Sequence, residues 1–377
     1  MKQPEDNPYA RKIRVLLVDD SAVMRSLLRM ALESKPCIEI VAAASGGEEA
    51  LAEFDCLRPD LVLLDIEMPG MNGLEVVSAL RQRDPRVPVI MCSTLTWRGA
   101  RITIEALSRG ATDYVTKPGA QKGFHEGIGT LTRELLPKIL ALFPQQPSAP
   151  PQPRVAPVPE HRVALVPETR VALIPARPPR VVVVGVSTGG PAALEALLPK
   201  VPASFPLPIL IVQHMPRLFT GLLAERLNSL CALRVREGVS GVHPEPGVVD
   251  IARGDWHMEL SRDFRLRLNQ NDPENFCRPS VDVLFRTASA AAAGRVLGVI
   301  LTGMGSDGLA GCRAIRAAGG TILAQDAATS IIWGMPGAVV SAGLANKILP
   351  LDAIAGELVR LAGPPVPRPA AAEAVAL

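Results

Sequence analysis

Two residues that can do chemistry, Asp65 and Ser187, stand on either side of a proline-rich segment in this 377-residue chain. Asp65 ends the apolar run Leu61–Leu64, and Ser187 follows the run Val181–Val186. A carboxylate at the carboxyl end of a strand is suited to accept a phosphoryl group. A serine at a strand-to-helix turn is suited to be a nucleophile. Together the two residues predict an enzyme whose reaction is switched by transfer of a phosphoryl group.

Polar groups also follow the other predicted strands of the first 140 residues. In chain order the strand ends carry Asp19-Asp20, Asp65, Ser93 and Lys117, and such ends meet in one crevice of a parallel sheet. Three converging carboxylates repel one another unless a hard cation lies between them, and Mg²⁺ suits oxygen ligands. Ser93 could then hydrogen-bond a phosphoryl oxygen, and Lys117 could pair with its charge. Each acid alone could be a turn residue or a helix cap, but the agreement of all the strand ends favours a phosphoacceptor pocket.

The residues around Ser187 fit two motifs. Gly185-Val186-Ser187-Thr188-Gly189 fits G-x-S-x-G, a turn that exposes a nucleophile at the start of a helix. The same segment is one substitution away from the dinucleotide-binding fingerprint G-x-G-x-x-G. A dinucleotide site would place an acid near the end of the next strand, Leu207–Val212, but His214 stands there instead. A histidine at this position favours a general base over a group that binds ribose.

A third polar residue completes a possible triad. Asp307 lies in a glycine-rich turn after the predicted strand Val296–Leu301. Ser187, His214 and Asp307 would form a hydrolytic triad in the chain order Ser-His-Asp, which differs from the Ser-Asp-His order of α/β-hydrolases. Taken singly, the three could be a helix cap, a core histidine and a turn residue. Their placement at three strand ends of one sheet favours the triad.

The elements that must position these residues alternate between strand and helix, which indicates an α/β fold. Residues 13–140 predict a doubly wound parallel sheet of five strands, with helices such as Ala22–Ser34 and Gly73–Arg83 between them. Residues 180–355 predict a second parallel sheet with its own helices. The stretch Val248–Leu268 alternates like antiparallel strands, so a β-ribbon or small insert is expected there.

A proline-rich segment separates the two units. Eleven of the 36 prolines fall between Pro144 and Pro179, where glycine is absent, which favours an extended, semi-rigid linker. Its repeats of Val and Ala could instead be a docking peptide. The predicted division is 1–140, 141–179 for the linker, 180–363, and a disordered tail at 364–377.

Composition excludes several functional classes. The formal charge of +3 is spread along the chain and aromatic residues make up 3%, which argues against a nucleic-acid partner. No apolar run has membrane-spanning length and no signal peptide is visible, so no membrane insertion is expected. The six cysteines form no Cys-x-x-Cys pair, which argues against a disulfide framework or structural zinc. A reduced, cytoplasmic protein is predicted.

The first unit closely resembles the receiver domain of two-component response regulators. The resemblance rests on Val18-Asp19-Asp20-Ser21, on the segment Asp65–Gly73 and on Thr116-Lys117-Pro118. It implies that Asp65 is the phosphoacceptor and that Asp19, Asp20 and Asp65 bind Mg²⁺. It also implies that Ser93 and Lys117 act in the phosphorylation switch, and that Tyr114 is the rotating aromatic residue of the family.

The second unit resembles the catalytic domain of chemotaxis protein-glutamate methylesterases, the CheB-type family. The shared motifs are Gly185–Pro191, Gln213–Pro216, Gly254–Met258, Arg278–Asp282, Leu301–Gly308 and Gly334–Pro336. The resemblance implies that Ser187 is the nucleophile, His214 the base and Asp307 its orienting acid. The backbone N–H groups of Thr188 and Met304 would form the oxyanion hole. Departures from the family pattern occur at Cys277, Ala327 and Trp256, none of them in the triad.

Together the resemblances imply a phosphorylation-activated hydrolase that demethylates glutamate methyl esters, and deamidates glutamines, on chemoreceptors during chemotaxis adaptation. The implied phosphodonor is a chemotaxis histidine kinase, ester hydrolysis needs no cofactor, and a monomer is expected.

Three competing functional classes are less consistent with the sequence. A DNA-binding response regulator would need a basic helix-turn-helix after the linker, which is not visible. A binding protein with an inactive second domain would not need the triad, which is intact. A nucleotide-dependent oxidoreductase would need the ribose-binding acid, which is missing. The hydrolase is therefore the function that the sequence favours.

Overall fold

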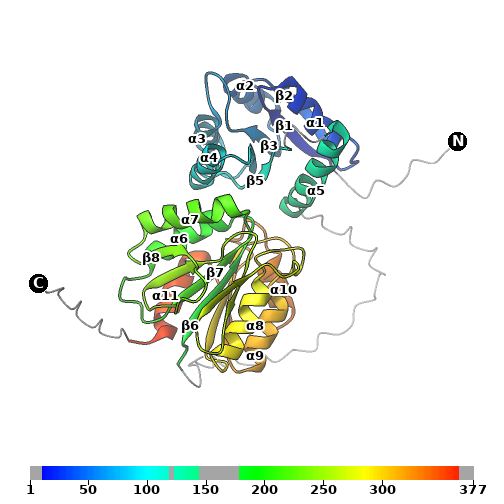
Figure 1. Ribbon diagram of the computed structural model, residues 1–377. Coiled ribbons are helices and arrows are strands. Elements are labelled where there is room, and N and C mark those ends of the chain that lie inside the picture. The colour runs from blue at the N-terminus through cyan, green and yellow to red at the C-terminus, as the bar shows by residue number, and fades with distance from the viewer. Residues whose placement is uncertain (1–10, 119–122, 144–177, 365–377) are drawn as a thin grey trace, which may run out of the picture.

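The computed structural model describes residues 11–118, 123–143 and 178–364. Most of the predicted linker and almost all of the predicted tail lie outside these ranges. The described chain forms two α/β units (Figure 1), each built on a parallel sheet with helices packed against it. This confirms the predicted fold class. Among the described residues, no helix combines the length and the apolar composition needed to cross a bilayer.

The N-terminal unit is a five-stranded parallel sheet in the order β2-β1-β3-β4-β5. Its strands are β1 (Ile13–Val18), β2 (Ile38–Ala44), β3 (Leu61–Asp65), β4 (Val89–Ser93) and β5 (Asp113–Thr116). Its helices are α1 (Ala22–Glu33), α2 (Gly47–Leu57), α3 (Gly73–Arg83), α4 (Trp97–Ser108) and α5 (Phe124–Leu142). The central strands are buried on both faces, as their continuous apolar runs predict. Because every strand is parallel, their carboxyl ends share one edge.

The C-terminal unit is a seven-stranded parallel sheet in the order β14-β13-β12-β6-β7-β9-β8. Its strands are β6 (Val181–Val186), β7 (Ile209–Gln213), β8 (Arg234–Glu237), β9 (Val248–Ile251), β12 (Val296–Ile300), β13 (Thr321–Gln325) and β14 (Lys347–Leu349). Its α-helices are α6 (Gly190–Leu197), α7 (Arg217–Leu230), α8 (Val281–Ala291), α9 (Leu309–Ala317), α10 (Met335–Ser341) and α11 (Leu351–Ala362). A single turn, η1 (Leu198–Lys200), extends α6. β6, β7 and β12 are adjacent in the centre, so the residues that follow them lie together.

One prediction for this unit is partly wrong. Only β10 (His257–Leu260) and β11 (Leu266–Asn269) form the expected antiparallel ribbon. β9 instead joins the main sheet in parallel, because all four of its residues are buried between neighbouring elements. The apparent alternation arose from Asp250, whose carboxylate lies inside and is paired with Arg236 at 2.6 Å.

The two units meet through α4 and β5 of the first and α6 and α7 of the second (Figure 1). The ring of Tyr114 on β5 stacks on Phe219 of α7, with centroids 4.5 Å apart. Apolar side chains from both units share one continuous buried cluster. The N-terminal unit therefore covers the end of the second sheet where Ser187 lies.

Candidate active site

Ser187 lies in a tight turn between β6 and α6 in which two glycines are needed. Gly189 has φ 77°, in the left-handed region. A Cβ atom on Gly190 would lie 1.9 Å from Oε1 of Gln213. Glycine at these positions lets the chain turn sharply after Ser187, so that α6 begins at Gly190.

The loop after β12 lies against this turn. The N–H of Ser187 donates to the carbonyl of Thr302 at 3.0 Å, and Oγ1 of Thr302 donates to the carbonyl of Thr188 at 3.0 Å. A Cβ atom on Gly303 would lie 2.8 Å from the Cβ of Ser187. The predicted oxyanion donors, the N–H groups of Thr188 and Met304, therefore belong to two segments that touch beside the serine.

His214 follows β7, and its ring is held by Asp307. Its backbone N–H donates to Val186 at 3.2 Å, and ring Nε2 lies 2.8 Å from Oδ2 of Asp307. With Asp307 accepting from Nε2–H, Nδ1 carries the lone pair that can take a proton. Ser187 and His214 line one cavity of about 40 Å³. Within the described chain no hydrogen bond joins them, so the structure brings the predicted triad together as a His-Asp pair with the serine beside it.

Cys277, a predicted departure from the family pattern, lies on another side of the imidazole. Its Sγ is 3.8 Å from Nδ1 of His214. Both residues, with Met304, line a cleft of about 560 Å³ between the two units. Nδ1 of His214 thus has the Cys277 thiol as a neighbour.

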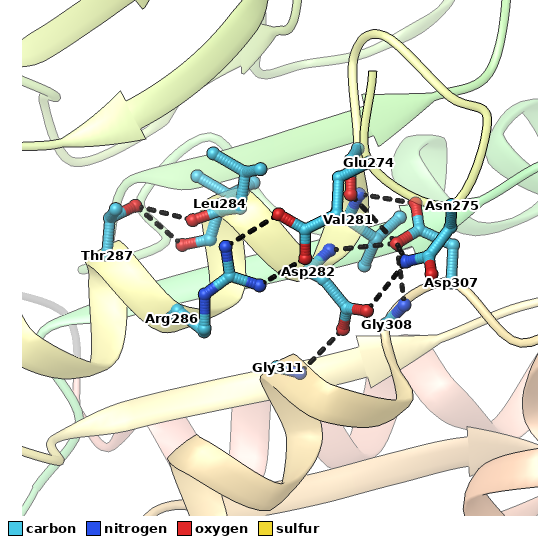
Figure 2. Close-up of polar contacts among 12 residues, drawn as sticks. Glu274, Asn275, Val281, Asp282, Leu284, Arg286, Thr287, Asp307, Gly308 and Gly311 are labelled. Carbon is cyan, nitrogen blue, oxygen red and sulfur yellow. Dashed lines mark hydrogen bonds and ion pairs between the residues drawn. The ribbon is translucent and has the colours of Figure 1, made fainter. Parts of the chain in front are cut away.

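The Asp307 carboxylate is buried at the first turn of α8, where many donors surround it (Figure 2). It accepts from the N–H groups of Val281 (2.7 Å), Asp282 (3.1 Å) and Gly308 (3.1 Å) and from the side chains of Ser280 (2.8 Å) and Asn275 (2.8 Å). Burial raises the pKa of Asp307, but His214 and several of these donors outweigh burial and hold the pKa at about 2. Asp307 is therefore an anion at neutral pH.

The charge of Asp307 acts on His214. Burial lowers the pKa of the imidazole, whereas the hydrogen bonds to Asp307 and Cys277 raise it to about 9. A general base must be neutral. In this arrangement His214 gains its basic form only as the pH rises through that value.

The predicted phosphoacceptor pocket lies at the carboxyl edge of the first sheet. One oxygen from each of Asp19, Asp20 and Asp65 lies within 4.8 Å of the others. Nζ of Lys117 is 2.7 Å from Asp19 and 2.7 Å from Asp65. Burial raises the pKa of Asp65 although Lys117 lowers it. The structure thus brings four of the predicted switch-pocket residues together.

The other two predicted switch residues contact α4 and the C-terminal unit. Ser93 is fully buried, and its hydroxyl accepts from Oγ1 of Thr103, on α4, at 2.8 Å. Tyr114 faces the C-terminal unit, where it stacks on Phe219. Both residues therefore connect the pocket edge with the interface between the units.

A carboxylate of the first unit contacts the turn that carries Ser187. Asp113, at the start of β5, is buried, and its Oδ2 accepts from Oγ1 of Thr188 at 2.7 Å and from Nζ of Lys138 at 2.5 Å. Asp113 and Tyr114 also line the small cavity that holds Ser187. In this arrangement the first unit closes over the serine.

Three polar residues that hold the site together were not predicted: Gln213, Asn275 and Asp113. Nε2 of Gln213 donates to the carbonyls of Ser187 (3.0 Å) and His214 (3.3 Å). The sequence does carry a signal for Gln213, because it is a polar residue that ends an apolar strand directly before the candidate base. Asn275 and Asp113 act across 32 and 75 residues of sequence, so no local pattern marks them.

Comparison with known proteins gives two family matches. Residues 182–358 match the model described as CheB methylesterase, and residues 15–128 match the response regulator receiver domain. A protein of Trichodesmium erythraeum named protein-glutamate methylesterase/protein-glutamine glutaminase is 45% identical, over 93% of this chain and 99% of its own. A protein of the same name from Nocardioides sp. is 47% identical, over 92% and 95%.

Among solved structures, the CheB methylesterase catalytic domain of Thermotoga maritima is 40% identical. The match covers 48% of this chain and 98% of that one, with a TM-score of 0.47.

Proposed function

Because this chain belongs to the CheB methylesterase family, with a receiver domain ahead of the esterase domain, we propose that it is a phosphorylation-activated protein-glutamate methylesterase. It hydrolyses glutamate methyl esters, and deamidates glutamines, on chemoreceptors. The observation that carries the proposal is the 2.8 Å contact of His214 with Asp307, with Ser187 on the same cavity. We assign 1–140 to the receiver, 141–179 to the linker, 180–363 to the esterase domain and 364–377 to a tail.

The first half of the reaction forms an acyl-enzyme. Oγ of Ser187 attacks the γ-carbonyl carbon of the ester while Nδ1 of His214 takes the hydroxyl proton. Asp307 accepts from Nε2–H and stabilises the imidazolium that results. The N–H groups of Thr188 and Met304 donate to the oxyanion, and one such donor is typically worth about 10²–10³ in rate.

The second half restores the enzyme. The tetrahedral intermediate expels methanol, which takes its proton from the imidazolium of His214, and a glutamyl ester of Ser187 remains. A water molecule then gives a proton to His214 and attacks that ester, which releases glutamate and returns the serine hydroxyl. With a glutamine substrate, ammonia leaves in place of methanol.

In the receiver, Asp65 takes the phosphoryl group from a chemotaxis histidine kinase. The close oxygen atoms of Asp19, Asp20 and Asp65 fit Mg²⁺, a hard cation that prefers oxygen ligands. When bound, Mg²⁺ neutralises these acids and the oxygens of the incoming phosphoryl group. Lys117 then pairs with the phosphoryl charge, and Ser93 donates a hydrogen bond to it.

Phosphorylation opens the esterase cleft in this proposal. The phosphoryl group brings a charge of about −1.5 to −2 next to Lys117. Movement of Ser93 toward it breaks the bond between Ser93 and Thr103 on α4, the helix that packs against α6 and α7. Repacking of α4 loosens the interface that covers Ser187.

The first test is methanol release from methylated receptor membranes, with and without a small phosphodonor and Mg²⁺. We expect the phosphodonor to raise the rate by about 5–150-fold, the usual range of coupling between two sites. Asp65→Asn should lose this stimulation because it removes the phosphoacceptor. Asp55→Asn, an exposed acid on α2, serves as the matched control and should keep it. Equal stimulation of Asp65→Asn would contradict the assignment.

A second test concerns the contact between Asp113 and Thr188. Asp113→Ala removes a buried, charge-assisted hydrogen bond from the closed interface, a contact worth about 1.5–3 kcal/mol. We expect methanol release without phosphodonor to rise by up to about 10–100-fold and further stimulation to shrink. Glu33→Gln, on the exposed side of α1, should behave as wild type. An Asp113 variant with wild-type basal release and full stimulation would show that this contact does not hold the closed form.

A further inference from the structure

We propose that Asn275 is a positioning residue for ester hydrolysis: it fixes the Asp307 carboxylate toward His214 by bridging Asp307 to a second buried carboxylate, Asp282. The inference rests on the proposed function of the triad. Nδ2 of Asn275 lies 2.8 Å from Oδ1 of Asp307 and 2.8 Å from Oδ2 of Asp282 (Figure 2). The Asn275 amide therefore donates one proton to each of the two carboxylates.

The two oxygens of Asp307 have different tasks. Oδ2 faces His214 and also accepts from the N–H of Val281. Oδ1 points away from His214 and accepts from Asn275, Ser280 and two backbone N–H groups. Anchoring Oδ1 fixes the rotation of the carboxylate, so Oδ2 stays in line with Nε2–H.

Asp282 explains why an amide is needed at this position. It is 3% exposed, and its other oxygen accepts from the N–H of Gly311 at 2.6 Å. Burial raises the pKa of Asp282, and the neighbouring charge of Asp307 raises it further. Two buried carboxylates that approach one donor repel each other unless protons lie between them. An amide nitrogen supplies two donors and no charge, whereas a carboxylate at 275 would add a third anion.

The backbone around Asn275 is built to deliver this side chain. Asn275 and Phe276 have φ of 53° and 61°, and Glu274 and Cys277 exchange backbone hydrogen bonds of 3.1 and 2.9 Å. Two central residues with positive φ define a tight hairpin turn that favours asparagine. Glu274 ties the turn to α8 through Arg286, at 2.7 Å (Figure 2). The centre of the turn thus presents Asn275 to Asp307, and Cys277 at its end contacts His214.

The experiment compares Asn275→Gly, Asn275→Ala and Asn275→Asp in the full-length chain. Glycine keeps the positive φ of the turn and removes the side chain that carries the amide. We expect Asn275→Gly and Asn275→Ala to lower kcat for methanol release by about 10–150-fold, the usual effect of losing a hydrogen bond to a charged group, with little change in KM. Asn271→Gly, at an exposed asparagine four residues earlier in the chain, is the matched control and should keep wild-type kcat.

A titration separates positioning from a general loss of stability. The titratable groups that face His214 are Asp307 and Cys277. Loosening Asp307 weakens its pairing with the imidazole, so the pKa of His214 should fall in Asn275→Gly and Asn275→Ala. An added anion in Asn275→Asp should raise it. The ring resonances of the five histidines can be followed by NMR against pH, with His214→Gln for assignment.

Opposite shifts in the glycine and aspartate variants would support the proposal. Wild-type kcat and an unmoved His214 titration in Asn275→Gly would overturn it, even if Asn275→Ala were impaired, because only the turn would then matter. The NMR titration needs no substrate. An absence of methanol release by wild-type protein on verified substrate would therefore count against the proposed function and leave the test of positioning intact.

Discussion

Ser187→Ala is expected to lower methanol release from methylated receptor membranes by at least about 10⁴-fold. In hydrolases with a comparable triad, loss of the serine removes acyl-enzyme formation and leaves only the contributions of binding and the oxyanion hole. The rate should be measured with phosphodonor and Mg²⁺ present, so that closure by the receiver does not limit either protein. Thermal unfolding should be unchanged, since Oγ of Ser187 makes no hydrogen bond within the described residues.

Two controls sharpen this test. Ser229→Ala removes an exposed serine on α7 and should retain the wild-type rate. The double variant Ser187→Ala, Cys277→Ala asks whether the thiol near His214 supplies the residual rate. A single Ser187→Ala protein that keeps more than about a hundredth of wild-type release would contradict the assignment of the nucleophile.

Asp307→Asn should lower kcat by about 10⁴-fold, the size of effect seen when the acid of a triad becomes an amide. An asparagine amide can donate to Nε2 of His214, which leaves the ring proton on Nδ1. Nδ1 is the atom that must accept the proton of Ser187, so the base is lost although the ring stays in place. Oδ2 of Asp307 also accepts from the N–H of Val281 at 2.7 Å, so the amide nitrogen of the variant would face a second donor, and thermal unfolding should be measured beside kcat.

The pH profile of the same variant gives an independent check. The pKa of His214 stands at about 9 because Asp307 and Cys277 outweigh burial, so wild-type kcat/KM should rise with pH through that region. Without the Asp307 anion, burial still lowers the pKa of His214 and only Cys277 still raises it. The acid limb of the pH profile should therefore move to lower pH. Asp352→Asn, in the exposed first turn of α11, is the matched control. A residual rate above about a tenth of wild type, with an unmoved acid limb, would contradict the role of Asp307.

The fold, and the sheet edges at which the strands end, could be predicted because they depend on local patterns. Apolar runs such as Leu61–Leu64 and Val181–Val184 mark buried parallel strands, and the polar residues that follow them share a sheet edge. The error at β9 has the same origin, because Asp250 interrupts the apolar pattern of this strand although its carboxylate is buried and pairs with Arg236. Local pattern therefore predicts where a strand lies better than which neighbour it pairs with.

The supporting contacts of the candidate site could not be predicted in this way. Asn275 and Asp113 reach partners far away in sequence, and the second of these contacts joins two units. His214 and Asp307 were found because each ends or follows a strand. Asn275 lies in a hairpin turn whose positive φ values are visible only in the structure.

The stacking of Tyr114 on Phe219 has a thermodynamic consequence for signalling. The stack joins the two units in this structure, so the free energy that holds the units together is shared by the receiver and the esterase. Binding linkage is reciprocal: if phosphorylation favours the open cleft, then a receptor segment seated in the open cleft must favour the phosphorylated receiver by the same factor. A receptor segment would thus act as an effector of the receiver as well as a substrate.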